Sequence, residues 1–212
     1  MTAASGGDRQ DRASRLRARA RRWARALGAV LLALALLSAP VARVRAQADY
    51  TEYQVKAAFL FNFARFVEWP APAAEPPADA PVLICVLGDD PFDKDLERAV
   101  KDKQVRGRNV EIKRAGQLSE LMACPLIFIG ASEERRLEWI LGELKGKSVL
   151  TVGEFDSFAK RGGMIGFKIE SRRVRFDINT QAADAVGLKL SSQLLKVGDV
   201  VTSAPAAPEE AK

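Results

Sequence analysis

The chain contains no histidine among its 212 residues. This absence excludes Ser-His-Asp and Cys-His relays, zinc sites with histidine ligands, and phosphorylation on histidine. Carboxylates alone can still support acid–base chemistry, but the sequence singles out no catalytic pair of them. It also has neither an EF-hand loop nor the glycine spacing of a dinucleotide-binding motif. We therefore predict that the protein is not an enzyme and holds no metal and no cofactor.

Cysteine is also scarce, because the chain has only Cys85 and Cys124. Two cysteines in an exported protein most simply form one disulfide. The alternative is a pair of buried free thiols. Spacing alone does not separate a structural bridge from a redox switch, and we favour the structural role.

The chain has no apolar run as long as the roughly 18–20 residues that span a bilayer. The apolar stretch Ala26–Leu37 follows an arginine-rich segment and precedes small or β-branched residues at Val44–Ala46. These are the parts of a secretion signal. We predict that residues 1–46 are a signal peptide cleaved near Ala46, with Ala42 as the second choice and an uncleaved membrane anchor as the alternative.

The formal net charge of +6 comes from this leader. Residues 1–46 hold ten arginines and two acids, so the rest of the chain has 23 basic and 25 acidic residues, a net charge of −2. The main argument for binding nucleic acid is thereby lost. We predict one exported domain at residues 47–202 and a disordered tail at 203–212.

Hydrophobic periodicity predicts alternating helices and strands in the exported domain. The first helix begins with a capping box at Thr51 and Gln54, and its side chains Glu52, Lys56 and Arg65 are expected to face solvent. Helices are expected at about 51–67, 91–101, 130–144 and 179–197, the last interrupted near Gly187, and strands at 82–87, 109–114, 125–129, 148–152, 164–169 and 174–178.

The last two of these strands are typical of a β-hairpin, whereas the earlier ones alternate with helices. This order predicts an α/β fold. We expect a three-layer sandwich with a mainly parallel sheet that is extended by a C-terminal antiparallel hairpin.

Glycine and polar residues follow three of the predicted parallel strands. The carboxyl ends of such strands meet at one edge of an open sheet, where a ligand crevice lies if one exists. Free N–H groups at Ser132, which is expected to begin a helix, can hold an anion. Five acids make the edge acidic, however, and would repel a phosphate: Asp89, Asp90, Glu133, Glu134 and Glu154. Turn formation alone also explains the glycines. The candidate ligand-binding residues are Gly88, Asp89, Gly130, Ser132, Gly153 and Glu154.

Seven segments of the exported domain together match the sequence pattern of a known protein family. They are Tyr53–Phe63, Phe66–Pro70, Ile84–Gly88, Cys124–Ile129, Leu150–Gly153, Ile178–Asn179 and Gly187–Lys196. Together they resemble the YfiR family of bacterial periplasmic proteins. The likeness extends from about Tyr50 to Val197, and the opening helix is its most specific part.

The resemblance implies a periplasmic regulator that is not an enzyme. Proteins of this family bind the periplasmic sensor region of an inner-membrane diguanylate cyclase and hold it inactive, which lowers cyclic di-GMP and biofilm formation. Cys85 and Cys124 match a disulfide pair of the family. A second pair, found in its best-known branch, is absent because residues 132–163 contain no cysteine. This absence argues against redox control of repression in this chain.

We therefore expect a periplasmic protein that represses a membrane signalling enzyme by direct contact. It would reach the membrane only through that partner and would bind no nucleic acid. Whether it forms a homodimer stays open. The alternative is a periplasmic small-molecule binding protein that uses the glycine-rich strand ends as its crevice.

Overall fold

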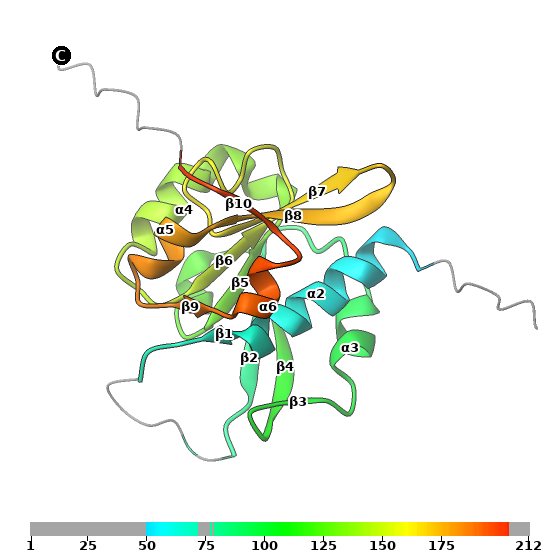
Figure 1. Ribbon diagram of the computed structural model, residues 1–212. Coiled ribbons are helices and arrows are strands. Elements are labelled where there is room, and N and C mark those ends of the chain that lie inside the picture. Colours follow the sequence, from blue (N-terminus) through cyan, green and yellow to red (C-terminus); the bar gives the residue numbers. More distant parts are fainter. Residues whose placement is uncertain (1–49, 72–76, 78, 204–212) are drawn as a thin grey trace, which may run out of the picture. The chain divides into compact units, whose positions relative to one another are not determined.

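The computed structural model describes residues 50–71, 77 and 79–203. The predicted signal peptide and most of the predicted tail lie outside the described residues. One sheet runs through the described domain in the order β10-β8-β7-β6-β5-β2-β4-β3 (Figure 1). Its strands are β2 (Val82–Leu87), β3 (Gln104–Val105), β4 (Arg108–Ala115), β5 (Leu126–Ile129), β6 (Leu150–Gly153), β7 (Ile165–Glu170), β8 (Arg173–Asn179) and β10 (Asp199–Val201).

The centre of this sheet is parallel, with β4, β2, β5, β6 and β7 all running in the same direction. Strands β7 and β8 form the antiparallel hairpin, and β10 pairs with β8 in parallel. The predicted α/β fold with a mainly parallel sheet and an antiparallel C-terminal hairpin is confirmed. A separate pairing joins β1 (Val67–Glu68) to β9 (Lys189–Leu190).

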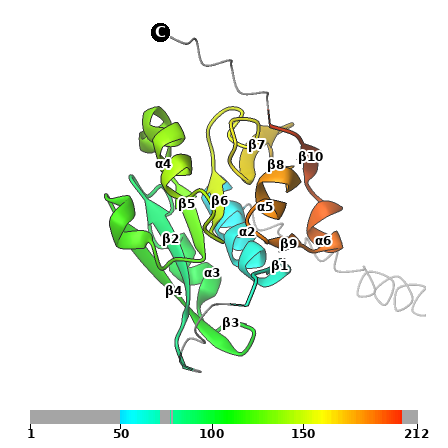
Figure 2. The ribbon, with the colours of Figure 1, turned by 90° about the vertical axis from the view of Figure 1, so that its left-hand side faces the viewer.

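Helices cover both faces of the sheet (Figure 2). One hydrophobic core lies beneath α2 (Glu52–Phe66), α3 (Asp95–Val100), α5 (Thr180–Asp184) and α6 (Ser192–Leu195). The other lies beneath the 3-10 helix η1 (Leu118–Leu121) and α4 (Leu137–Glu143), which follows a second 3-10 helix, η2 (Ala131–Arg136). Strand β2 serves both cores, because Ile84 and Val86 belong to the first and Cys85 and Leu87 to the second. Since strand side chains alternate between faces, a strand buried on both must be apolar throughout.

Helix α2 begins with the predicted capping box. The Gln54 backbone N–H donates to the Thr51 hydroxyl, and the Thr51 N–H donates to the Gln54 side-chain oxygen, each over 3.2 Å. The two hydrogen bonds satisfy N–H groups that the first turn of a helix leaves without partners.

Aromatic side chains hold α2 against the hairpin. The ring of Phe63 is fully buried, and its centre lies 5.8 Å from that of Phe167 in β7 and 5.1 Å from that of Phe176 in β8. Phe59, one turn earlier, lies 5.1 Å from Phe176. Aromatic pairs at such distances add to the stabilisation that burial provides.

The second helix begins later than the sequence pattern predicts. Helix α3 begins at Asp95 rather than at Pro91. The Phe92 N–H donates to the side chain of Asp90 at 2.8 Å, and Asp93 has a φ angle of 49°. This turn occupies the residues that were expected to form the first helical turn.

Two further helical regions are divided. The region expected from Gly130 is the 3-10 helix η2 followed by α4. The last region begins at Asn179, whose side chain accepts a hydrogen bond from the Ala182 N–H at 3.0 Å, as the sequence predicts. It breaks at Gly187, which has a φ angle of 76°, and β9 and α6 follow.

Replacing Phe63 by Ala should lower the free energy of unfolding by about 3–5 kcal/mol, because it removes a fully buried ring and leaves a cavity. Ala58→Ser, at an exposed position of the same helix, should change it by no more than about 0.5 kcal/mol. Urea denaturation of both variants measures the difference. Equal stabilities would show that the aromatic contacts do not hold α2 on the sheet.

Candidate functional site

The glycines that follow three parallel strands lie at one edge of the sheet. Gly88 and Gly130 come directly after β2 and β5, and Gly153 ends the neighbouring strand β6. The Gly130 N–H donates to the carbonyl of Leu87 at 2.9 Å, which links two of these strand ends. The carboxyl edge that the sequence predicts is therefore present, with its candidate residues close together.

Close packing explains these glycines without a ligand. A side-chain carbon on Gly88 would lie 2.5 Å from the hydroxyl oxygen of Ser132, and one on Gly130 would lie 2.5 Å from the carbonyl oxygen of Asp89. One on Gly153 would overlap a phenylalanine ring. The Ser132 hydroxyl accepts a hydrogen bond from the Asp89 N–H at 2.9 Å instead of capping a helix. Ligand binding at this edge stays a prediction.

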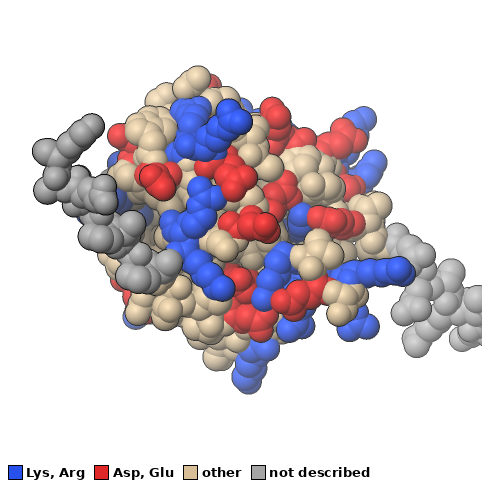
Figure 3. Space-filling model, turned by 90° about the horizontal axis from the view of Figure 1, so that it is seen from above, with Lys and Arg blue, Asp and Glu red and all other residues tan. Residues whose placement is uncertain are grey.

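Four of the five acidic side chains at this edge have cationic partners, and the fifth, Asp89, is exposed. The charge of the edge is therefore more balanced than the acids alone predict. The end of the molecule seen in Figure 3 shows basic and acidic side chains interspersed. The ion pairs, measured from nitrogen to oxygen, are Asp90–Arg114 at 2.5 Å, Glu133–Arg136 at 3.1 Å, Glu134–Arg161 at 2.8 Å and Glu154–Lys56 at 2.8 Å.

The sequence places Lys56 in solvent, and the structure shows that this prediction is wrong. The Lys56 side chain is only 5% exposed. Its Nζ lies 2.8 Å from Glu154 and 2.5 Å from Glu52, and 4.8 Å from the centre of the Tyr53 ring. Helical periodicity misses this contact because Glu154 is 98 residues away in the chain.

Burial by itself lowers the pKa of Lys56, because it penalises the charged amine. The hydrogen bonds to Glu154 and Glu52 outweigh that penalty, so the pKa of Lys56 is raised above its usual value. The pKa of Tyr53 is also raised, first by burial and then by the negative charge of Glu154. This charged cluster ties the beginning of α2 to the carboxyl end of β6.

Cys85 and Cys124 form a disulfide, with their Cα atoms 6.2 Å apart. Both side chains are buried in the core beneath α4. Cys85 lies inside β2 and Cys124 just before β5, and these two strands are neighbours in the sheet. The bridge agrees with the pairing that the residues and the family resemblance predict.

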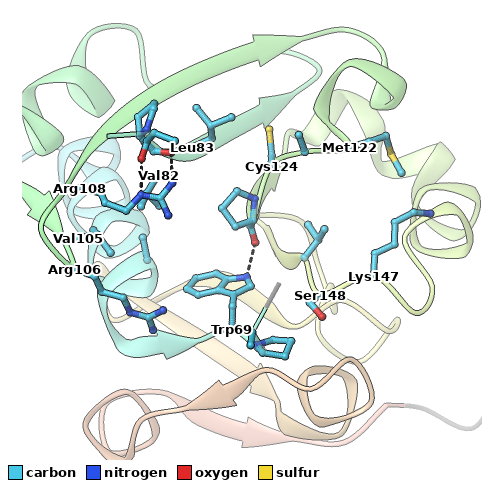
Figure 4. Close-up of a pocket in the computed structure, with 18 residues that line it drawn as sticks. Trp69, Val82, Leu83, Val105, Arg106, Arg108, Met122, Cys124, Lys147 and Ser148 are labelled. Carbon is cyan, nitrogen blue, oxygen red and sulfur yellow. Dashed lines mark hydrogen bonds between the residues drawn. The ribbon is translucent and has the colours of Figure 1, made fainter. Parts of the chain in front are cut away.

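A hollow of about 850 Å³ lies at the opposite edge, where β2, β5 and β6 begin (Figure 4). The sequence predicts a crevice at the carboxyl edge, as is general for open α/β sheets, and gives no sign of this hollow at the amino edge. Its lining at the strand beginnings consists of Val82, Leu83, Cys124, Pro125, Ser148 and Val149.

Trp69 lies at this hollow with its ring held in place. Its Nε1–H donates to the carbonyl of Pro125 at 3.1 Å, and the guanidinium of Arg106 lies 5.8 Å from the ring centre. Arg106 lies in the turn between β3 and β4, and Arg108 is the first residue of β4. Arg106 and Gly107 both have positive φ angles, 54° and 77°, as in a two-residue type I′ turn. The sequence pattern does not predict this turn. The basic side chains that the turn brings to the hollow were therefore not predicted either.

Within the described residues, no group of three or more His, Cys, Asp or Glu side chains is placed to hold a metal ion. The same part of the chain has no helix with the length and apolar character needed to cross a membrane. A comparison with protein families matches residues 53–199, more than half of the chain, to a family described as YfiR/HmsC-like. The matched region includes the disulfide, both edges of the sheet and the hairpin, and the resemblance seen in the sequence is confirmed.

Replacing Lys56 by Met should lower the free energy of unfolding by about 3 kcal/mol, because it leaves the buried carboxylate of Glu154 without its cation. Glu52→Gln is the matched control, since it removes the partner that is 43% exposed, and it should cost less than about 1 kcal/mol. Lys56→Met combined with Glu154→Gln should recover part of the loss. Urea denaturation tests this, and equal losses for the two single variants would contradict it.

The same cluster predicts a pH dependence. Because the pKa of Lys56 is higher in the folded state, its contribution to stability is complete below the unfolded pKa and is lost as pH rises through the folded one. The wild-type protein should therefore lose stability above about pH 10.5 more steeply than Lys56→Met. Parallel stability curves in that range would show that the ion pairs do not stabilise the fold.

Removing the disulfide by Cys85→Ala with Cys124→Ala should cost about 4 kcal/mol in the chain-entropy model, since the bridged residues are 39 apart. Reduced wild-type protein serves as the control and should unfold at a similarly low urea concentration. A double variant as stable as the oxidised protein would argue that the bridge does not stabilise the fold.

Proposed function

The chain belongs to the YfiR/HmsC-like family, and from this premise we propose that it represses an inner-membrane diguanylate cyclase. Family membership points to periplasmic regulation of cyclic di-GMP signalling rather than to catalysis. In our proposal, repression works by direct contact with the periplasmic sensor region of the cyclase. The observation that carries the proposal is the family match over residues 53–199.

The chemistry of the described residues supports a binding role. Four of the five carboxylates at the carboxyl edge of the sheet are engaged in ion pairs, and Glu154 pairs with the buried Lys56. The whole chain also lacks histidine, the commonest acid–base group in enzymes.

Two features support a periplasmic location. Residues 1–46 have the arginine-rich, apolar and small-residue parts of a secretion signal. The Cys85–Cys124 disulfide fits an oxidising compartment, where such bridges persist. Export would bring the protein to the side of the membrane on which the sensor region of the cyclase lies.

Binding of a small molecule is a second candidate function. The structure favours the hollow at the amino edge over the carboxyl edge as the place for it. The glycine-rich edge is closely packed, whereas the hollow beside Trp69 offers space and basic side chains. A ligand there is compatible with repression, since a regulator can bind both a signal molecule and a partner.

Affinity purification from solubilised inner membrane tests the proposed repression. The tagged protein, expressed from its full coding sequence, should retain a diguanylate cyclase that has a periplasmic sensor region, and mass spectrometry identifies the retained proteins. Cells lacking the protein should contain more cyclic di-GMP, and the wild-type gene should restore the lower level. Failure to retain any membrane signalling protein would count against the proposal.

A leader deletion provides the matched control. A chain that begins after Ala46 keeps all residues of the domain but should stay in the cytoplasm, so it should leave cyclic di-GMP high. Repression by this shortened chain would contradict contact on the periplasmic side. Cys85→Ala with Cys124→Ala adds a test of the bridge, and undiminished repression by a folded double variant would assign the disulfide a structural role only.

A further inference from the structure

The hollow at the beginning of β2, β5 and β6 combines apolar walls with positive charge. Among the described residues, the 18 that line it include Arg106, Arg108 and Lys147 and no aspartate or glutamate (Figure 4). The two arginines lie on one side of the hollow and Lys147 on the other. The apolar part of the wall is formed by side chains that include Trp69, Pro70, Val82, Val105, Met122 and Val149.

We propose that this hollow binds a small aromatic carboxylate. The flat ring would pack beside Trp69 and the apolar wall, and the carboxylate would accept hydrogen bonds from Arg106 and Arg108. This inference goes beyond the proposed repression, because it stands whether or not a cyclase is the partner.

The positive charge here is available to a ligand. Arg106 donates to the carbonyl of Val67 at 2.8 Å, and Arg108 donates to the carbonyls of Ala80 at 2.5 Å and Pro81 at 3.3 Å. These neutral acceptors orient the guanidinium groups but do not neutralise them. No ion pair among the described residues joins either arginine to a carboxylate.

An arginine held in this way suits a carboxylate. A guanidinium has five N–H donors in a planar fork, so one or two bonds to carbonyls leave donors free. A carboxylate accepts such bonds with the strength of a charge-assisted pair. The fixed arrangement also lowers the entropy that binding would otherwise cost.

The wall favours a ligand with an apolar, flat body. The ring of Trp69 is fixed by its hydrogen bond to Pro125, and it faces a space of about 850 Å³. Volumes of about 300–1,000 Å³ are typical of small-molecule sites lined mainly by apolar groups. An inorganic anion would leave the apolar wall exposed to water and would gain nothing from burying it. A cation would be repelled by the basic residues.

The test compares 2-naphthoate with 2-naphthamide, which has nearly the same shape and no charge. Protein labelled with ¹⁵N and expressed from its full coding sequence is titrated with each, and the indole N–H signal of Trp69 is followed by NMR. Trp139→Phe identifies that signal, because Trp69 and Trp139 are the two tryptophans that follow the predicted signal peptide. We expect the Trp69 signal to shift with naphthoate, and naphthoate to bind about tenfold or more tightly than the amide.

Arg106→Gln and Arg108→Gln should each weaken naphthoate binding about tenfold, while binding of the amide changes little. Arg172→Gln, at an exposed position of the β7–β8 turn, is the matched control and should bind naphthoate like the wild type. Arg106→Lys keeps the charge if Arg106→Gln proves unstable, and it should retain part of the affinity. Equal binding of acid and amide, a Trp69 signal that does not move, or equal effects of Arg172→Gln and Arg108→Gln would overturn the proposal.

Discussion

The packing of helix α2 against the sheet is the interaction on which the other features depend. Its buried face carries Phe63, which contacts the rings of both hairpin strands. Because the helix is packed against the sheet, its second turn places Lys56 against Glu154 at the carboxyl edge. The chain that follows its last turn places Trp69 at the amino edge. One helix thus supplies a key side chain to each edge.

The two edges of the sheet consequently differ in character. At the carboxyl edge, close contacts at Gly88 and Gly130 and four ion pairs fill the space between strand ends. At the amino edge, two arginines that bond only to backbone carbonyls among the described groups lie on one side of an apolar hollow. The first arrangement stabilises the fold, and the second leaves charge and space for another molecule. This contrast separates the structural charges of the domain from those that can take part in binding.

The sequence predicted features that depend on local pattern. The capping box at Thr51, the apolar strand β2 and the β7–β8 hairpin all follow from side chains close together in the chain. It did not predict features that need contacts between distant segments. Lys56 looks solvent-exposed on a helical wheel because its partner Glu154 follows the distant strand β6. Strands as short as β3 and β10 have too few residues to show a period. The basic hollow was missed for the same reason, since its arginines come from the short β3–β4 hairpin.

We propose that this domain represses a membrane cyclase by binding its periplasmic sensor region. Turnover of the purified cyclase tests this proposal in proteoliposomes that carry the sensor region outward and enclose GTP, while the protein is added from the outside. The account predicts that cyclic di-GMP synthesis falls to a low plateau as the protein saturates the sensor region, and that a cyclase lacking this region is unaffected. Unchanged synthesis at saturating protein, or equal inhibition of the cyclase that lacks its sensor region, would contradict it.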